Sequence, residues 1–350
     1  MGDQLSLFGG GGGGDDAGAR GHGTTYTSGL VQPHVADEDR ELAARIPSFI
    51  RFGTSSWSFP GWSNIVWSGR PSEAELARSG LEAYARHPLF RAVSLDRSYY
   101  GPLRDDDLRV YAAQLEVARQ KAPALPPFRM VSKVWDEITT AVYPRHPRYG
   151  ARAGMRNPHF LDVERFTSEV LAPYQRSFTS DAGPFVFELT PMPQGAIEER
   201  ALVARVDDFI SRLPGGGQRW AFELRNAELF GKRWVDMLRA NRAAHVLTYW
   251  TAMPALREQL RAKAITAPFT VVRLMLPPYT RYASRKADFA PFDKLAEPQP
   301  EMREDVIAAL RAAAEAGCDE GFVLVNNKAE GSAPLTVREL AKMTASAFSR

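Results

Sequence analysis

The chain of 350 residues contains a single cysteine, Cys318, and no long apolar run. One cysteine excludes an intramolecular disulfide and fits a reducing compartment. No apolar run approaches the roughly 18 residues that a membrane-spanning helix requires, and the first residues lack the basic and apolar segments of a signal peptide. We therefore expect a soluble, cytoplasmic protein with no membrane partner.

Histidine is also scarce, with six residues and no His-x-His or His-Glu-x-x-His spacing, which excludes the usual His-rich metal centres. No metal ligand is assigned. A carboxylate-only Mg²⁺ or Mn²⁺ site made by Asp96, Glu188 and Glu223 stays open as a weaker alternative. Ser55 and Ser56 have no evident histidine base, which argues against a Ser-His-Asp hydrolase.

The formal net charge of +3 is unevenly distributed. Residues 1–40 hold six acidic and two basic residues, so the remainder carries 42 basic residues against 35 acidic ones. An excess of positive charge in the main part of the chain suits an anionic ligand.

The first segment has the composition of a flexible tail, because residues 9–14 are all glycine and apolar residues are few. Such a segment cannot bury enough apolar surface to offset the entropy of ordering. We expect residues 1–46 to form a disordered N-terminal tail and residues 47–350 to form one folded domain.

The folded part alternates apolar strand-like runs with helix-like periodicity eight times, and eight such units are what a closed (β/α)₈ barrel requires. The other α/β candidate, an open doubly wound sheet, normally carries G-x-G-x-x-G after its first strand, and that motif is missing. We therefore predict a TIM-like barrel. The predicted strands are 50–57, 92–96, 128–134, 184–189, 220–224, 245–249, 269–276 and 321–326.

Several segments together resemble the YecE-like proteins, known as domain of unknown function 72, over residues 51–340. The resemblance is carried by FGTSSW at 52–57, SLDRSYY at 94–100, VSKVWDEIT at 131–139, FELR at 222–225, VR at 272–273 and VNN at 325–327. It implies a TIM-like barrel and no particular reaction. The chain departs from the family pattern at strands 4, 6 and 7, where it has Glu188, Thr248-Tyr249-Trp250 and Leu274-Met275-Leu276.

Charged residues at the predicted strand ends are the candidate site, because barrels of this type bind ligands at the C-terminal ends of their strands. Glu188 and Glu223 lie on adjacent strands and form a candidate general acid/base pair, with Lys133 as a third catalytic candidate. The candidate ligand-binding residues are Trp57, Asp96, Arg97, Tyr99, Arg225, Arg273, Asn326 and Asn327. A structural alternative stays open, in which these residues form a ring of salt bridges such as Glu223 with Arg273.

Two loops mix basic and aromatic residues, a combination that suits a phosphodiester backbone with stackable bases. They span residues 143–156, with no acid between residues 138 and 161, and residues 279–286. The alternative is a pair of solvated, mobile loops. A third anion-site candidate is the turn at 331–334, where Ser332 would cap a helix and leave backbone N–H groups free.

A short peptide in the tail carries a separate signal. The segment Gln4-Leu5-Ser6-Leu7-Phe8 resembles the motif by which bacterial replication and repair proteins bind the DNA sliding clamp. In such a motif Leu7 and Phe8 would fill an apolar pocket, with Leu5 and Gln4 supporting them. The alternatives are that these apolar residues are incidental or dock on the barrel itself.

Three functions follow from these observations. The first is a barrel that binds or processes a phosphate-containing ligand, such as nucleic acid, near the sliding clamp; a reaction would make it a hydrolase or lyase. The second is a metabolic enzyme for a small phosphorylated or carboxylated substrate. The third is a non-catalytic anion-binding module.

Overall fold

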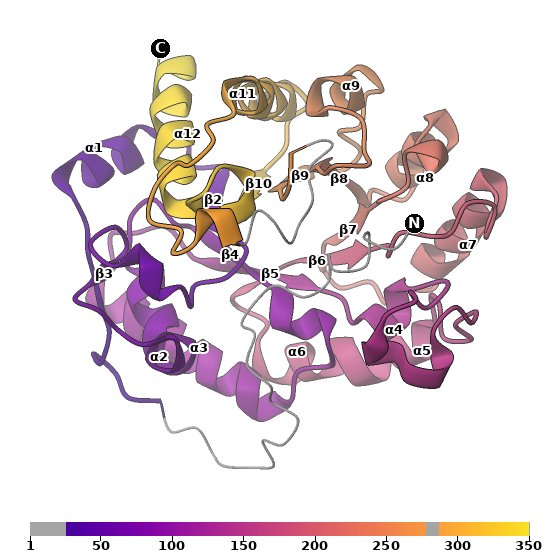
Figure 1. Cartoon of the computed structure of the whole chain (residues 1–350), viewed down its shortest axis with the longest axis horizontal. Coiled ribbons are helices and arrows are strands. Elements are labelled where there is room, and N and C mark those ends of the chain that lie inside the picture. The colour runs from indigo at the N-terminus through magenta and orange to yellow at the C-terminus, as the bar shows by residue number, and fades with distance from the viewer. Residues whose placement is uncertain (1–25, 278–286, 350) are drawn as a thin grey trace.

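The computed structural model describes residues 26–277 and 287–349 (Figure 1). Eight parallel strands close into a barrel in the order β10-β2-β4-β5-β6-β7-β8-β9, which confirms the predicted (β/α)₈ architecture. The barrel strands are β2 (Ile50–Thr54), β4 (Ala92–Leu95), β5 (Arg129–Lys133), β6 (Ala182–Glu188), β7 (Trp220–Glu223), β8 (Ala244–Tyr249), β9 (Phe269–Leu274) and β10 (Glu320–Val325).

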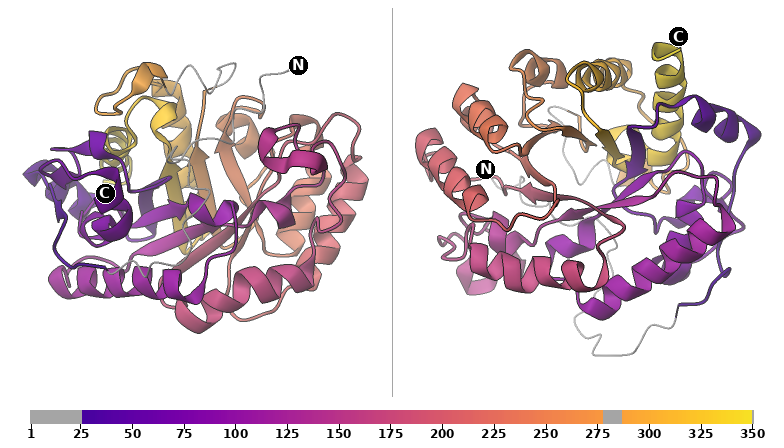
Figure 2. Two further views of the ribbon diagram at one scale, coloured as in Figure 1. Left: turned by 60° about the horizontal axis from the view of Figure 1, so that its bottom comes forward. Right: turned by 180° about the vertical axis from the view of Figure 1, so that it is seen from behind.

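Helices surround this ring of strands, as Figure 2 shows from two further sides. The longer ones are α2 (Glu73–Ala85), α3 (Asp105–Lys121), α7 (Glu199–Ser211), α8 (Lys232–Ala240), α11 (Pro300–Glu315) and α12 (Ala333–Ala347). Shorter ones are α4 (Asp136–Thr139), α5 (Val163–Arg165), α6 (Ala172–Ser177) and α9 (Leu256–Arg261), with a π-helical stretch at Phe166–Leu171 joining α5 to α6. Within the described residues no helix combines the length and apolarity needed to cross a membrane.

The barrel interior is a separate apolar core, because successive strand residues point alternately inward and outward. Its ten buried members are Ala92, Val131, Val186, Ala221, Ala244, Val246, Phe269, Val271, Phe322 and Leu324. The same alternation carries charged residues at both ends of this core: Arg129 and Lys133 flank Val131, for example, and Arg219 and Glu223 flank Ala221. The interior therefore has an apolar middle between two charged ends.

Close strand packing explains the glycine in the FGTSSW segment. A Cβ on Gly53 would lie 2.1 Å from the carbonyl oxygen of Ala92, so only glycine lets β2 approach β4 this closely. Thr54 follows, and its hydroxyl lies 2.7 Å from the hydroxyl of Tyr84 on α2. This segment fixes the first strand against its neighbour and its helix.

The N-terminal boundary of the folded part differs from the prediction. The described residues 26–46 include β1 (Gln32–Pro33), which pairs with β3 (Trp67–Ser68), and α1 (Asp37–Arg45), which lies beside α12 (Figure 1). Buried Asp39 accepts hydrogen bonds from Arg338 at 2.7 and 2.9 Å, and Leu42 and Ile46 join the outer apolar core. This part of the predicted tail therefore belongs to the folded domain, which composition missed because the anchoring contacts are distant in sequence.

Candidate functional site

Five charged residues meet at the C-terminal ends of β5, β6, β7 and β9, and we call them the strand-end cluster. They are Lys133, Glu188, Glu223, Arg225 and Arg273, all buried. Their positions follow from the inward-facing alternation of each strand, and Glu188 pairs directly with Glu223 in the β6–β7 register. The structure thus brings together the three predicted catalytic residues and two of the predicted ligand-binding arginines.

Glu188 is the centre of the cluster, because one of its carboxylate oxygens forms ion pairs with three cations. Its Oε2 lies 3.0 Å from Lys133 Nζ, 2.8 Å from Arg225 Nη2 and 2.6 Å from Arg273 Nη1. Burial alone would raise the pKa of Glu188, but Arg225, Lys133 and Arg273 outweigh it and hold the pKa well below its usual value. An acid held ionised in this way suits positioning of the cations better than proton donation at neutral pH.

Glu223 completes the pairing on the other side. Its Oε1 lies 2.6 Å from Arg225 Nη2 and accepts a hydrogen bond of 3.0 Å from the Thr248 hydroxyl, while its Oε2 is paired with Arg273 Nη1. The Glu223–Arg273 pair is the one that the structural alternative named. The two glutamates are therefore bridged by the same two arginines, and each carboxylate is already engaged.

Within the cluster three cations face two carboxylates, and Asp96 beside it supplies a third negative charge. Asp96 approaches Arg273 Nη2 only to 3.7 Å, and its own oxygen accepts a hydrogen bond of 2.9 Å from Ser94. Burial alone would lower the pKa of the Arg273 guanidinium, but Glu223, Glu188 and Asp96 outweigh it and raise the pKa. Among the described residues, Nε of Arg225 and both Nε and Nη2 of Arg273 are buried without a hydrogen-bond partner.

Aromatic rings lie against the cations of the cluster. The Lys133 ammonium lies 4.0 Å from the centre of the Tyr99 ring, and the Arg225 guanidinium lies 3.9 Å from the Trp250 ring. Both distances are within the range of cation–π attraction. Tyr99, predicted to bind ligand, is thus part of the wall that holds Lys133.

Two predicted ligand-binding residues lie away from the cluster. The Trp57 indole is buried in the helix layer, where its N–H donates to the Leu76 carbonyl at 3.0 Å and its ring meets Tyr111 edge-on. Arg97 turns toward α3 and pairs with Asp107 at 3.2 Å. Both residues lie two or three positions after the end of a strand, where the chain has already turned outward, so proximity in sequence did not place them at the barrel mouth.

Asn326 and Asn327 organise the backbone after β10. Asn326 Oδ1 accepts a hydrogen bond from the Lys328 N–H at 3.0 Å, and Asn327 Oδ1 accepts from the Ala333 N–H at 2.8 Å. Ser332 is the N-cap residue of α12, as expected, but its hydroxyl makes no capping hydrogen bond, and the Asn327 side chain accepts from the first turn of the helix instead. The backbone N–H of Ala333 is therefore occupied rather than free for a phosphate.

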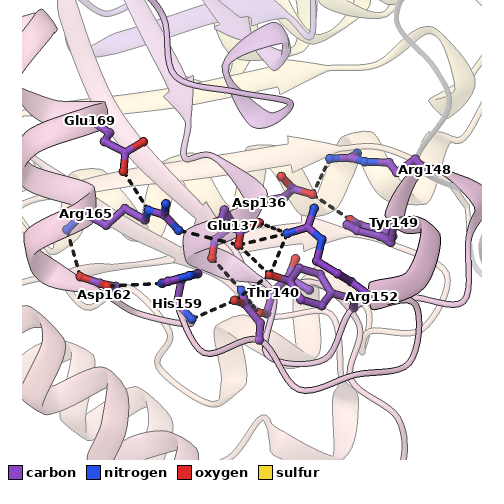
Figure 3. Close-up of polar contacts among 12 residues, drawn as sticks. Asp136, Glu137, Thr140, Arg148, Tyr149, Arg152, His159, Asp162, Arg165 and Glu169 are labelled. Atoms are coloured by element: carbon purple, nitrogen blue, oxygen red, sulfur yellow. Dashed lines mark hydrogen bonds and ion pairs between the residues drawn. The ribbon is translucent and has the colours of Figure 1, made fainter.

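The basic loop at residues 143–156 is anchored by two acids that precede it (Figure 3). Arg148 pairs with Asp136, whose carboxylate also accepts a 2.8 Å hydrogen bond from Tyr149. Arg152 lies 2.9 Å from Glu137. Sequence reasoning missed this pairing because both acids lie before the acid-free stretch, on α4, and α4 turns them back onto the loop.

Arg148 also connects the loop to the strand-end cluster. Its guanidinium lies 4.8 Å from the Tyr100 ring, 4.9 Å from the Tyr149 ring and 5.6 Å from the Tyr99 ring. Tyr100 is 47% exposed, so the series Lys133, Tyr99, Arg148 and Tyr100 runs from the buried cluster to the surface. We call Arg148 and Tyr100 the rim. The second basic loop and the clamp-like peptide at 4–8 lie outside the described residues.

The carboxylates do not form a metal centre in the part of the chain that the structure describes. No group of three or more His, Cys, Asp or Glu residues is placed there to hold a metal ion. Glu188 and Glu223, which the carboxylate-only Mg²⁺ or Mn²⁺ site would use, are instead neutralised by Lys133, Arg225 and Arg273.

Comparison with known proteins places these features in a family context. A family model described as "Protein of unknown function DUF72" matches residues 51–350. A DUF72 family protein from Enterococcus faecalis V583 superimposes with a TM-score of 0.53 at 18% identity, covering 84% of this chain and 95% of that one. A DUF72 family protein from Thermotoga maritima MSB8 gives 0.53 at 17% identity, covering 84% and 98%. No curated protein sequence matches the chain.

Proposed function

We propose a function for this chain, which belongs to the family of proteins of unknown function DUF72: it binds a phosphate-containing ligand at the strand-end cluster, with nucleic acid as the favoured class. The YecE-like assignment within this family stays a prediction. The observation that carries the proposal is the set of buried N–H groups on Arg225 and Arg273 that lack a hydrogen-bond partner. Leaving such donors unpaired costs free energy that an anion would recover.

The position of the cluster supports ligand binding. It lies at the C-terminal ends of the barrel strands, the end at which enzymes of this architecture bind their substrates. Lys133 and the two arginines would hold phosphate oxygens, while Glu188 and Glu223 keep the three cations in place. Any reaction would then use these cations to stabilise negative charge on a phosphate.

The rim favours nucleic acid over a small phosphorylated metabolite. Tyr100 offers an exposed ring, and Arg148 lies 4.8 Å from its centre. Bases of a single strand stack on aromatic rings and on arginine planes, at about 1–3 kcal/mol per base. A phosphate at the cluster with a base at the rim would use both features together.

The binding test measures fluorescence anisotropy of a labelled single-stranded oligonucleotide over a salt series. Tyr100→Ala should weaken binding about tenfold through lost stacking, and Lys133→Gln should weaken it and flatten the salt dependence. Leu30→Ala is the matched control, because Leu30 is a similarly exposed large side chain on the N-terminal segment. Unchanged binding in both test variants would contradict the proposal, and phosphate binding that Lys133→Gln removes, with no binding of DNA, would favour the metabolic alternative.

The second part of the proposal is that residues 4–8 dock the protein on the DNA sliding clamp. Its basis is the sequence Gln4-Leu5-Ser6-Leu7-Phe8 followed by six glycines, which would let the barrel swing on a flexible tether. Capture by a bacterial sliding clamp should be lost in Leu7→Ala/Phe8→Ala and retained in Thr24→Ala/Thr25→Ala, a double change outside residues 4–8. Equal capture of the wild type and the double variant would refute the tether and leave the ligand site untouched.

A further inference from the structure

A pocket of about 310 Å³ opens at the other end of the barrel, where the strands begin. We call it the basal pocket; its charged and polar lining includes Arg129, Thr179, Ser180, Gln218, Arg219 and Glu320. Arg129 and Glu320 are the first residues of β5 and β10, and Arg219 directly precedes β7. The pocket is therefore built on rigid strand starts and lies at the opposite end of the apolar interior from the strand-end cluster.

Three arginines converge there on one carboxylate. Glu320 lies 2.5 Å from Arg51 Nε and 3.9 Å from Arg129 Nε, and it is also paired with Arg219. Asp319 contributes one more negative charge, at 2.7 Å from Arg219 Nη2. Three guanidinium groups thus share two carboxylates, and a positive charge is left over.

Two buried arginines next to the pocket contribute to this excess of positive charge. Burial, followed by the charges of Arg129 and Arg219, lowers the pKa of Arg51 to about 10. Arg91 lies behind Arg51, is 7% exposed, and has two guanidinium nitrogens buried without a partner. Asp181 lies nearby and pairs with Arg119 at 2.6 Å, and Arg119 is shared with Glu116 at 2.7 Å. With Arg91 and Arg119 counted, five guanidinium groups face four carboxylates, so one positive charge remains.

We propose that the basal pocket binds a small phosphate-class oxyanion, such as inorganic phosphate or a small phosphomonoester, between Arg129 and Arg219. Both side chains are 28% exposed, so they reach the pocket while remaining anchored to Glu320. The arginine fork matches the oxygens of phosphate, and the buried Arg51 adds positive potential from below.

Size and neighbouring groups narrow the ligand class. A volume of about 310 Å³ lies at the lower end of the range for small-molecule pockets, which excludes a folded partner and favours a compact anion. Thr179, Ser180 and Gln218 provide neutral hydrogen-bonding groups along the edge.

The test titrates inorganic phosphate into the full chain by calorimetry at constant ionic strength. Arg129→Gln/Arg219→Gln should weaken binding by about tenfold or more, because charge-assisted hydrogen bonds are lost. Arg212→Gln is the matched control, since Arg212 is an exposed arginine paired with Asp208 outside the pocket. Lys133→Gln distinguishes the basal pocket from the strand-end cluster, because it should weaken only the cluster and leave the basal phosphate site intact.

A second variant keeps the arginines and adds the charge that the pocket lacks. Ser180 is exposed, and its carbonyl already accepts a hydrogen bond from Arg129, so Ser180→Asp would place a carboxylate at the edge of the pocket. In the Lys133→Gln background, which weakens the strand-end cluster, we expect Ser180→Asp to abolish phosphate binding and raise the unfolding midpoint, whereas neutral Ser180→Asn should do neither. The proposal is overturned if Ser180→Asp and the double arginine variant bind phosphate as the wild type does, or if Lys133→Gln alone removes the binding.

Discussion

Replacing Glu188 by glutamine would test the electrostatic account of the strand-end cluster most directly. The amide has nearly the same shape as the carboxylate but no charge, so Lys133, Arg225 and Arg273 would be left around Glu223 alone. Removing one partner from a buried ion pair typically costs about 3–5 kcal/mol. We expect Glu188→Gln to lower the free energy of unfolding by an amount of this size.

The pH dependence of the loss has a defined sign. Because the pKa of Glu188 is lowered in the folded protein, its stabilisation is fully present above the ordinary value of 4.5 and is lost as the pH falls through the folded value. The stability difference between wild type and variant should therefore be constant at neutral and mildly acidic pH. It should begin to narrow as the pH falls below about 4.5 and disappear only once the pH has passed the lowered folded value.

The assay is urea unfolding at several pH values, followed by tryptophan fluorescence. Asp208→Asn serves as the control, because the Asp208–Arg212 pair at 3.2 Å is exposed and should contribute about 0–1 kcal/mol. Phosphate should restore part of the stability of Glu188→Gln by taking the place of the lost charge. A Glu188→Gln protein as stable as the wild type at neutral pH would refute the reasoning.

Three further variants test other parts of the fold. Asp39→Asn should lower the free energy of unfolding by about 3–5 kcal/mol, measured by urea unfolding, because it leaves Arg338 without its buried partner. Burial alone would raise the pKa of Asp39, but its bonds to His87 and Arg338 lower it, so this contribution should persist above the usual 3.8 and disappear in stronger acid. Trp57→Phe should cost about 1 kcal/mol through the lost indole hydrogen bond and leave oligonucleotide anisotropy unchanged; weaker DNA binding would return Trp57 to the ligand site. Thr248→Val should cost a similar amount in thermal unfolding, and no loss would show that Glu223 needs no third donor.

The strands and the buried charges at their ends could be predicted from the sequence, because both depend on local pattern. Apolar runs mark the strands, and a charged residue that ends such a run, such as Lys133 or Glu223, can only lie at a barrel mouth. The ion-pair partner of each charged residue could not be predicted in full. Glu188 accepts from three different strands, and strand-to-strand geometry is not visible in a linear sequence.

Three side chains have partners that the local sequence pattern does not indicate. Asp39 pairs with Arg338, which no local composition of the predicted tail could indicate. Trp57 lies three residues after the end of β2, and its hydrogen bond to Leu76 holds it in the helix layer. Asn327 supplies the side-chain bond that the Ser332 N-cap lacks, because a short turn brings it back to the start of α12.

The alternation of charged and apolar residues inside the barrel has a consequence for how the chain folds. A strand that slipped by one residue would turn all of its side chains to the opposite face. On β5 such a slip would move Arg129 and Lys133 into the apolar layer beneath the helices and bring Met130 and Ser132 inward. Misaligned barrels would thus bury unpaired charge and be strongly disfavoured. The charged residues at both ends of the barrel interior therefore help to select the correct strand register, independently of any ligand that either end binds.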